Sequence, residues 1–173
     1  MTLKTTSVTI LLLALLSGCA APARNTDSTP HSQTTPSPDN RIHFKGAEYR
    51  AQWQDDYNYN TPILIDTHSK WKTFLNRHPG EFTAPDTATD FYSQQFFQDS
   101  VVYAYLKSEP SGANQLRIQK AALENDTLKL YMENIIPQIG TMDMATRVCF
   151  FGIGRNVMKR FSEVEAVVIR KEE

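Results

Sequence analysis

The sequence is poor in cysteine, so several disulfides cannot hold the fold together. Its 173 residues include only Cys19 and Cys149, which allow at most one disulfide. The neighbours of Cys149 are apolar, which favours a buried and unreactive thiol.

The chain also lacks the short motifs that carry most recognisable chemistry. Its four histidines show no HExxH or paired spacing, and there is no CxxC and no GxSxG turn around a serine. No pair of carboxylates is singled out by its surroundings. The sequence thus predicts no catalytic residue, no metal site and no cofactor. We expect a protein that is not an enzyme, since function must be argued from a site.

A charge excess of either sign is missing too. The sequence has 18 Lys and Arg against 19 Asp and Glu, a formal net charge of −1. Nucleic-acid-binding domains normally carry a strong basic excess, so no nucleic-acid partner is expected. The apolar run near the start, Ile10 to Leu16, is much shorter than the roughly 20 residues that a membrane-spanning helix needs.

What the sequence does contain is an export signal at its start. Lys4, the apolar run and the small pair Ser17-Gly18 follow the order of a secretory signal. Leu16-Ser17-Gly18-Cys19 also resembles the lipobox of bacterial lipoproteins. That resemblance implies cleavage before Cys19, a diacylglycerol on its thiol and, often, an acyl chain such as palmitate on the new amino terminus. Residues 1–18 are therefore predicted to be a lipoprotein signal peptide.

Residues 19–40 are predicted to be a disordered tether behind the lipidated cysteine. From Ala20 onward this stretch holds four Pro and seven Ser or Thr, with no Val, Ile, Leu, Met or aromatic residue. Such a composition cannot bury enough apolar surface to offset chain entropy. A flexible coil of this length spans about 25 Å. Ala20 is not the aspartate that retains many lipoproteins in the inner membrane. The resemblance therefore favours the outer membrane in a Gram-negative host, with the domain in the periplasm or at the cell surface.

Residues 41–173 are predicted to form a single β-rich domain. A helix is expected after Asp66 or Thr67, because Trp71, Phe74 and Leu75 share one helical face and Pro79-Gly80 ends the pattern. Strands and helices do not alternate, so we expect an α+β fold. Its mostly antiparallel sheet of about seven strands would form a sandwich or open barrel, with one helix packed on it. The expected strands are 48–54, 62–65, 101–107, 115–123, 128–132, 147–153 and 164–169. Glu124-Asn125-Asp126 is expected to form the turn of a hairpin between the fourth and fifth of these strands.

Two groups of residues are candidates for contact with a partner. Tyr57 and Tyr59 would suit an exposed patch, since tyrosine is enriched at interfaces. The alternative is burial in the core, given the area that aromatic side chains bury. Arg155, Lys159 and Arg160 belong to a basic stretch that could steer a charged partner. The alternative for these is an ordinary solvated face.

The order of residues from Pro62 onward carries a second resemblance. An apolar strand leads to Trp71, Phe74 and Leu75, followed by Asp90-Phe91 and then by Phe97 and Asp99 before a strand at Val101. This resembles the carboxy-terminal domain of the PrcB family, bacterial lipoproteins associated with a surface protease complex. The turn that is Gly-Gly in that family is Gly112-Ala113 here. The resemblance implies an accessory role, so no catalytic residue is carried over.

These features predict a lipoprotein held to the membrane by the lipid on Cys19. Its domain is expected to bind an envelope or secreted protein, as an accessory, inhibitor or immunity-like protein. The alternative is an envelope module that holds a small cell-wall or lipid ligand. A pocket lined by Phe91, Phe96 or Tyr103 would favour that alternative.

Overall fold

The computed structural model describes residues 40–83 and 89–173, so the predicted signal peptide, lipobox and tether up to residue 39 lie outside the described residues. The strands in the described part are β1 (Arg41–Ile42), β2 (Phe44–Ala51), β3 (Ile63–Ile65), β4 (Gly80–Phe82), β5 (Ser100–Glu109), β6 (Gln115–Glu124), β7 (Thr127–Ile136), β8 (Ala145–Gly154) and β9 (Glu163–Glu172). The helices are α1 (His68–Arg77) and the short α2 (Phe96–Asp99), with 3₁₀ turns at Thr89–Tyr92 and Met158–Arg160.

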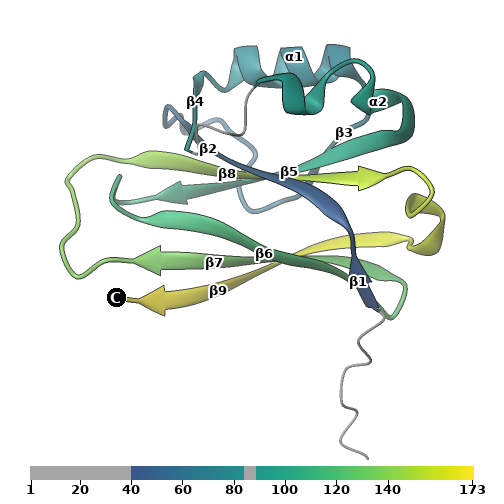
Figure 1. The fold of residues 1–173 in the computed structure, drawn as a ribbon. Coiled ribbons are helices and arrows are strands. Elements are labelled where there is room, and N and C mark those ends of the chain that lie inside the picture. Colours follow the sequence, from purple (N-terminus) through teal and green to yellow (C-terminus); the bar gives the residue numbers. More distant parts are fainter. Residues whose placement is uncertain (1–39, 84–88) are drawn as a thin grey trace, which may run out of the picture. The chain divides into compact units, whose positions relative to one another are not determined.

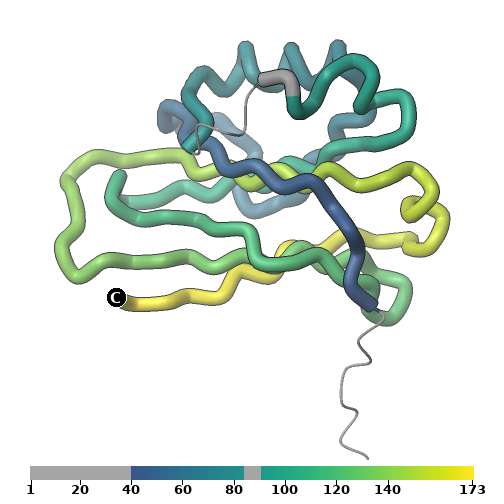
Figure 2. The backbone as a smooth tube through the Cα atoms, viewed as in Figure 1, coloured from purple at the N-terminus to yellow at the C-terminus, as the bar shows by residue number. Residues whose placement is uncertain are grey.

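The strands form two stacked sheets, and α1 and α2 cover the outer face of one of them (Figure 1). One sheet has the strand order β1-β6-β7-β9 and the other β3-β5-β8-β2-β4. The backbone path in Figure 2 shows β1 and β2 running from one sheet into the other, separated only by His43. The predicted α+β class, with a sandwich and one clear helix, is confirmed, although nine strands are described rather than seven.

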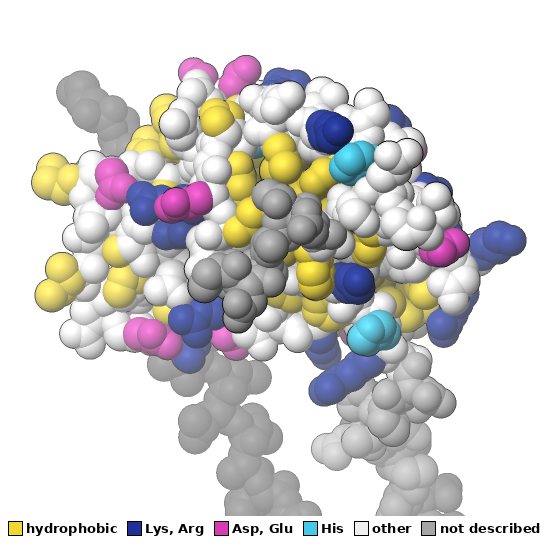
Figure 3. Space-filling model, turned by 45° about the horizontal axis from the view of Figure 1, so that its top comes forward, with side chains coloured by type: hydrophobic (Ala, Val, Ile, Leu, Met, Phe, Trp, Pro, Cys, Tyr) yellow, Lys and Arg dark blue, Asp and Glu magenta, His cyan; other side chains and the backbone are white. Residues whose placement is uncertain are grey.

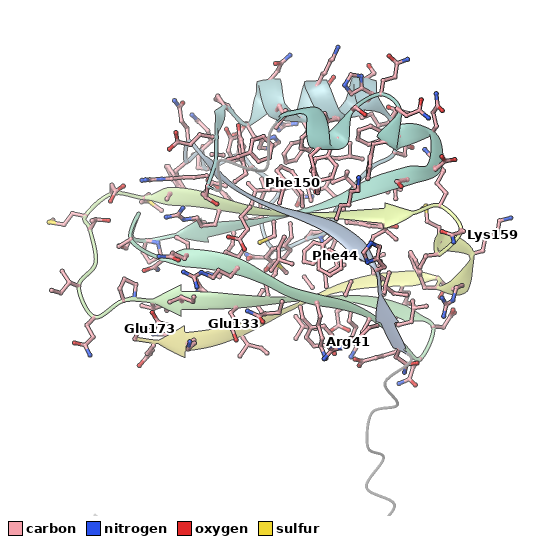
Figure 4. All side chains as sticks on the ribbon, viewed as in Figure 1. Arg41, Phe44, Glu133, Phe150, Lys159 and Glu173 are labelled. Atoms are coloured by element: carbon pink, nitrogen blue, oxygen red, sulfur yellow. The ribbon has the colours of Figure 1, made fainter. Side chains whose placement is uncertain are left out.

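The five-stranded sheet is buried on both faces. In β8, Val148 and Phe150 point into the core under α1, whereas Cys149, Phe151 and Ile153 point into the core between the sheets. All five are at most 1% exposed. A strand covered on both faces has no solvated side, so its sequence is a continuous apolar run rather than an alternation. Figure 4 shows Phe150 on the helix side of the sheet and Phe44 between the two sheets.

Helix α1 begins and packs as its sequence indicates. The hydroxyl of Thr67 accepts a hydrogen bond from the Lys70 N–H at 3.2 Å, which caps the first turn. Trp71 and Phe74 are buried, with ring centroids 4.8 and 5.6 Å from that of Phe150. Edge-to-face pairs of this kind add to the stability gained by burying apolar area. The predicted cap and apolar face are therefore confirmed, with Thr67 rather than Asp66 as the capping residue.

Local backbone geometry explains the tight turn between β6 and β7. Asn125 and Asp126 both have positive φ, 50° and 63°, and they form the two-residue connection between these strands. A hairpin turn with two left-handed residues matches the twist of the paired strands, and Asn and Asp tolerate it better than most residues. The hairpin predicted at this position is confirmed.

Two strands and one strand pairing were not predicted. The segments that form β1 and β4 have two and three residues, too short to show a periodic pattern, and β4 begins at Gly80, where the helical pattern was predicted to end. β9 pairs with β7 in parallel, not through a hairpin. Within the described residues, α1 and α2 are both too short to cross a membrane.

We expect the Phe150 ring to be the most costly aromatic side chain to remove from the helix-side core. The Phe150→Ala variant should lower the free energy of unfolding by about 3–5 kcal/mol, because it leaves a cavity among packed rings. Urea denaturation of the purified protein measures this change. Ile139→Ala, which truncates a side chain that is 86% exposed, is the control and should change stability by less than about 0.5 kcal/mol. Equal losses in the two variants would contradict this packing.

Candidate functional site

The predicted tyrosine patch does not exist as an exposed surface. Tyr57 is only 7% exposed, and its hydroxyl donates to the Arg77 carbonyl at 3.0 Å. The Tyr59 hydroxyl donates to the Gln54 carbonyl at 2.6 Å and also bonds the Thr146 hydroxyl at 2.8 Å. Both rings thus hold the 52–62 loop against the core. The prediction that this pair contacts a partner is wrong for the buried Tyr57, because the alternative of core burial holds there.

The three predicted basic residues lie in the connection between β8 and β9, which includes a 3₁₀ turn. Arg155 is exposed, but its guanidinium donates to the carbonyls of Asp66 and Phe97 at 2.6 and 3.2 Å. It therefore fastens the β8–β9 connection to the helix layer. Lys159 and Arg160 are exposed on the 3₁₀ turn that follows, and Figure 4 shows Lys159 projecting from the same end of the sandwich as Arg41.

Among the described residues, the two most exposed large apolar side chains lie in the connection between β7 and β8, and a third exposed one lies beside them. Ile139 is 86% exposed, Met142 106% and Met144 48%. Met144 lines a shallow depression together with Trp53, which is itself 36% exposed. We call Ile139, Met142, Met144 and Trp53 the distal tip. The β7–β8 connection, which carries the first three, lies at the end of the sandwich opposite β1 (Figure 1). Figure 3 shows hydrophobic side chains projecting from this end.

Hydrogen bonds fix the backbone of the distal tip. The Thr141 N–H donates to the Ser111 hydroxyl at 2.8 Å, and the Thr141 hydroxyl accepts from the Ala113 N–H at 3.1 Å. Asp143 accepts from the Gly112 N–H at 3.3 Å and pairs with Arg50 at 2.9 Å. These bonds tie the 137–144 connection to the 110–114 turn and to β2. The apolar side chains of the tip therefore project from an ordered loop.

A side chain at Gly112 would displace the Asp143 carboxylate where these two loops meet. A Cβ atom at this position would lie 2.2 Å from a carboxylate oxygen of Asp143, much closer than real Cβ contacts. The pKa of Asp143 is lowered, first by the Thr141 hydroxyl and also by the Gly112 N–H and Arg50. The carboxylate is thus held in its charged form by the groups that anchor the loop.

A buried polar cluster holds the 110–114 turn, to which the distal tip is hydrogen-bonded. Glu109 is 1% exposed, pairs with Lys107 at 2.7 Å and accepts from the Asn114 amide at 2.7 Å. Arg147 donates to the Gly112 carbonyl at 2.5 Å. Burial lowers the pKa of Arg147, and the neighbouring Arg50 lowers it further. Removing one partner from such a cluster leaves a buried charge uncompensated, so the cluster holds the 110–114 turn in one arrangement.

A second surface feature lies at the β1 end of the sandwich. It is a groove of about 840 Å³ with apolar walls from Phe44, Phe91 and Phe96. The Lys45 ammonium lies 5.0 and 5.7 Å from the ring centroids of Phe91 and Phe96. We call it the basic groove, because more cationic than acidic side chains line it. Its charged and titratable lining residues are Arg41, His43, Lys45, Arg160 and Asp99.

The described part of the chain contains no cluster of potential metal ligands. Across 40–83 and 89–173, no three His, Cys, Asp or Glu side chains come together as a group that could hold a metal ion. Cys149 is fully buried, and burial raises the pKa of its thiol. A buried thiol with a raised pKa is a poor nucleophile.

Comparisons with known proteins give no further guide to the site. No family model, no curated protein and no solved structure matches the chain. The described residues behind the PrcB resemblance are mostly core: Trp71, Phe74 and Phe97 are each at most 7% exposed. Such residues specify packing, whereas a partner is specified by the surface.

The sequence contains a weak signal for the exposure of the distal tip. Ile139, Met142 and Met144 stand among turn-forming residues, in a segment with neither strand nor helix periodicity. An apolar side chain in such a loop has no regular element to carry it into the core. This signal is weaker than a motif, because loops also cross over apolar surface.

His78 should make the stability of the domain depend on pH. It is 5% exposed, its Nδ1 lies 2.8 Å from the Phe74 carbonyl oxygen, and burial lowers its pKa below the ordinary 6.5. The unfolded chain therefore binds a proton more readily than the folded one. The contribution of His78 to the free energy of unfolding should therefore be complete above about pH 6.5. It should be lost as the pH falls toward the lowered pKa of the folded state.

Urea unfolding at pH 7.5 and pH 5.5 measures this dependence. His78→Gln should lose less stability between the two values than the wild type, whereas His43→Gln, which removes an exposed imidazole, should match the wild type. An unchanged pH dependence in His78→Gln would contradict the assignment.

Proposed function

We propose that this chain is a membrane-anchored bacterial lipoprotein whose domain binds an envelope or secreted protein through the distal tip. The role is one of binding rather than catalysis, as an accessory, inhibitor or immunity-like protein. Cys19 carries the lipid, and the outer membrane is the location in a Gram-negative host. The observation that carries the proposal is the exposure of Ile139, Met142 and Met144 on an ordered loop.

The chemistry of the tip suits a protein partner. Methionine and tryptophan are enriched at protein interfaces, and methionine adapts its shape to different surfaces. Burying one such side chain contributes about 1.5–3 kcal/mol, from which the costs of association must be subtracted. An ordered loop loses less conformational freedom on binding than a flexible one. The tip therefore has both the apolar area and the rigidity that an interface needs.

The position of the tip also favours a protein over the anchoring bilayer. β1 pairs with β6 at Ala121 and Ala122, next to the β6–β7 hairpin, whereas the tip follows the other end of β7. From Lys129 to Ile136, β7 rises roughly 25 Å. The tip is thus held far from the point at which the predicted tether joins β1.

The first test concerns the anchor. Cys19→Ser should abolish labelling by a radioactive or clickable fatty acid and should release the protein into the soluble fraction. The reason is that a diacylglycerol supplies most of the membrane affinity, at about 0.8 kcal/mol per buried methylene. Labelling measures the attachment of lipid, and fractionation measures the release of the protein from the membrane. A variant that stays labelled and membrane-bound would contradict the lipoprotein assignment.

The second test concerns the tip. A photo-crosslinking amino acid at Met144 in living cells should give one discrete protein adduct. Ile139→Ser together with Met142→Ser should abolish that adduct without lowering stability by more than about 0.5 kcal/mol, because both side chains are exposed. The same crosslinker at Lys159, at the opposite end of the sandwich, is the matched control. An adduct from Lys159 alone would place the interface at the predicted basic residues and would contradict the proposal that the distal tip binds the partner.

The basic groove supports a second candidate function, the holding of a small cell-wall or lipid ligand. Two of the residues expected in such a pocket, Phe91 and Phe96, line the groove, whereas Tyr103 is buried between the sheets. Cationic side chains beside apolar walls suit an amphiphile with a phosphate or carboxylate group. A crosslinker placed at Phe91 distinguishes the candidates, because a ligand of this class gives an adduct of lipid mass rather than protein mass.

A further inference from the structure

β9 is the longest strand at a sheet edge in the described part of the chain. The other edge strands, β1, β3 and β4, have two or three residues, whereas β9 has ten. It pairs with β7 from Glu163 to Glu172, and no described strand pairs with its other side. Its unpaired N–H and C=O groups are therefore open to another strand.

Several devices that proteins use to block such an edge are absent from β9. The strand contains no Pro and no Gly, and its register with β7 runs without a bulge. It does carry charged residues, which can repel other strands. Whether those charges repel or attract depends on how they are arranged along the strand.

The charges of β9 are unevenly distributed along its length. Glu163 and Glu165 lie in its first half, and the apolar run Ala166–Ile169 follows. Arg170, Lys171 and Glu172 lie at its end, where Glu172 pairs with Arg170 at 2.8 Å and the net charge is positive. An antiparallel copy of the same strand places this net positive end against the acidic first half, whereas a parallel copy would place like charges together. The net charges of β9 therefore favour the antiparallel direction.

We propose that β9 pairs with β9 of a second copy of this chain, antiparallel and about a two-fold axis at Val168. The two four-stranded sheets then become one continuous sheet. Val164, Ala166 and Val168 point into the core between the sheets, so residues 163, 165, 167, 169 and 171 face outward. In this register Glu165 lies opposite Lys171 of the second copy, and Val167 lies opposite Ile169. Glu163 lies opposite Glu173, a like-charge pair at the exposed ends of the two strands, where water screens the repulsion. A two-fold interface repeats each of these pairs.

The present partners of these charges do not oppose the pairing. Glu165 lies 3.8 Å from Lys129, and Lys171 lies 3.0 Å from Glu173. The side chains of Glu165, Lys171 and Glu173 are all more than half exposed, and such exposed ion pairs contribute little. Ile169 is 52% exposed and would be covered by the second copy. This surface is separate from the distal tip, so the inference stands or falls independently of the proposed function.

Disulfide crosslinking of the full chain in membranes tests the register. Glu165→Cys combined with Lys171→Cys should give a dimer band on a non-reducing gel that reductant removes. The two positions are roughly 20 Å apart within one strand, so they cannot join within one copy. The wild type and both single variants should remain monomeric on the gel, which also controls for Cys19 and Cys149.

Glu163→Cys combined with Ile169→Cys is the matched control. This pair has the same spacing and faces the same way, but its members are four residues out of register across the proposed axis, and it should not crosslink. Crosslinking of the control pair, or none from the 165/171 pair, would overturn the proposal.

A charge exchange tests the attraction itself. Glu165→Lys alone and Lys171→Glu alone should each weaken dimerisation several-fold, measured by sedimentation of the full chain in density-matched detergent. The double exchange should restore it, because the two charges then face each other with their signs reversed. Circular dichroism confirms that each variant is folded. A double variant as weak as the single ones, or a wild type that stays monomeric at every concentration, would contradict the pairing.

Discussion

The structure depends on the burial of β8 and β5 on both of their faces. Phe150 packs against the helix layer while Cys149 and Phe151 pack against the second sheet. A sheet with two apolar faces is stable in water only if something covers each of them. The aromatic stripe of α1 covers one face and the four-stranded sheet covers the other. The layer order therefore follows from two apolar runs in the sequence.

The same constraint sends polar groups to the ends of the sandwich, and the two ends differ. At one end β1 begins beside the basic groove, whose Lys45 lies over aromatic rings. At the other end, buried Glu109 and partly buried Arg147 fix a turn that in turn holds the distal tip. Exposed apolar side chains gathered at one place on a surface are a common mark of a protein interface. This contrast is the physical basis for the proposal that the tip docks a partner.

The sequence predicted the features that rest on local patterns. The helix was predicted from the cap at Thr67 and from the apolar face that Trp71 and Phe74 share. The hairpin was predicted from Asn125-Asp126. Both predictions succeeded because caps, apolar faces and left-handed turns depend on only a few neighbouring residues. The sequence did not predict β1 and β4, which exist only through pairing with distant strands. It left open whether Tyr57 is exposed or buried, because that depends on how the 52–62 loop folds against the core. The distal tip was missed for the same reason: whether Met142 is covered depends on tertiary structure.

The most direct test of the account is whether the distal tip is covered in the native envelope. Hydroxyl-radical footprinting of intact cells and of purified protein compares the oxidation rates of three methionines: Met142, 106% exposed; Met132, fully buried; and Met158, half-buried at the β1 end. If the tip is covered, Met142 oxidises several-fold more slowly in the envelope, while Met158 keeps its rate and Met132 stays unmodified in both. A Met142 rate in cells equal to that of the purified protein, relative to Met158, would contradict the proposal.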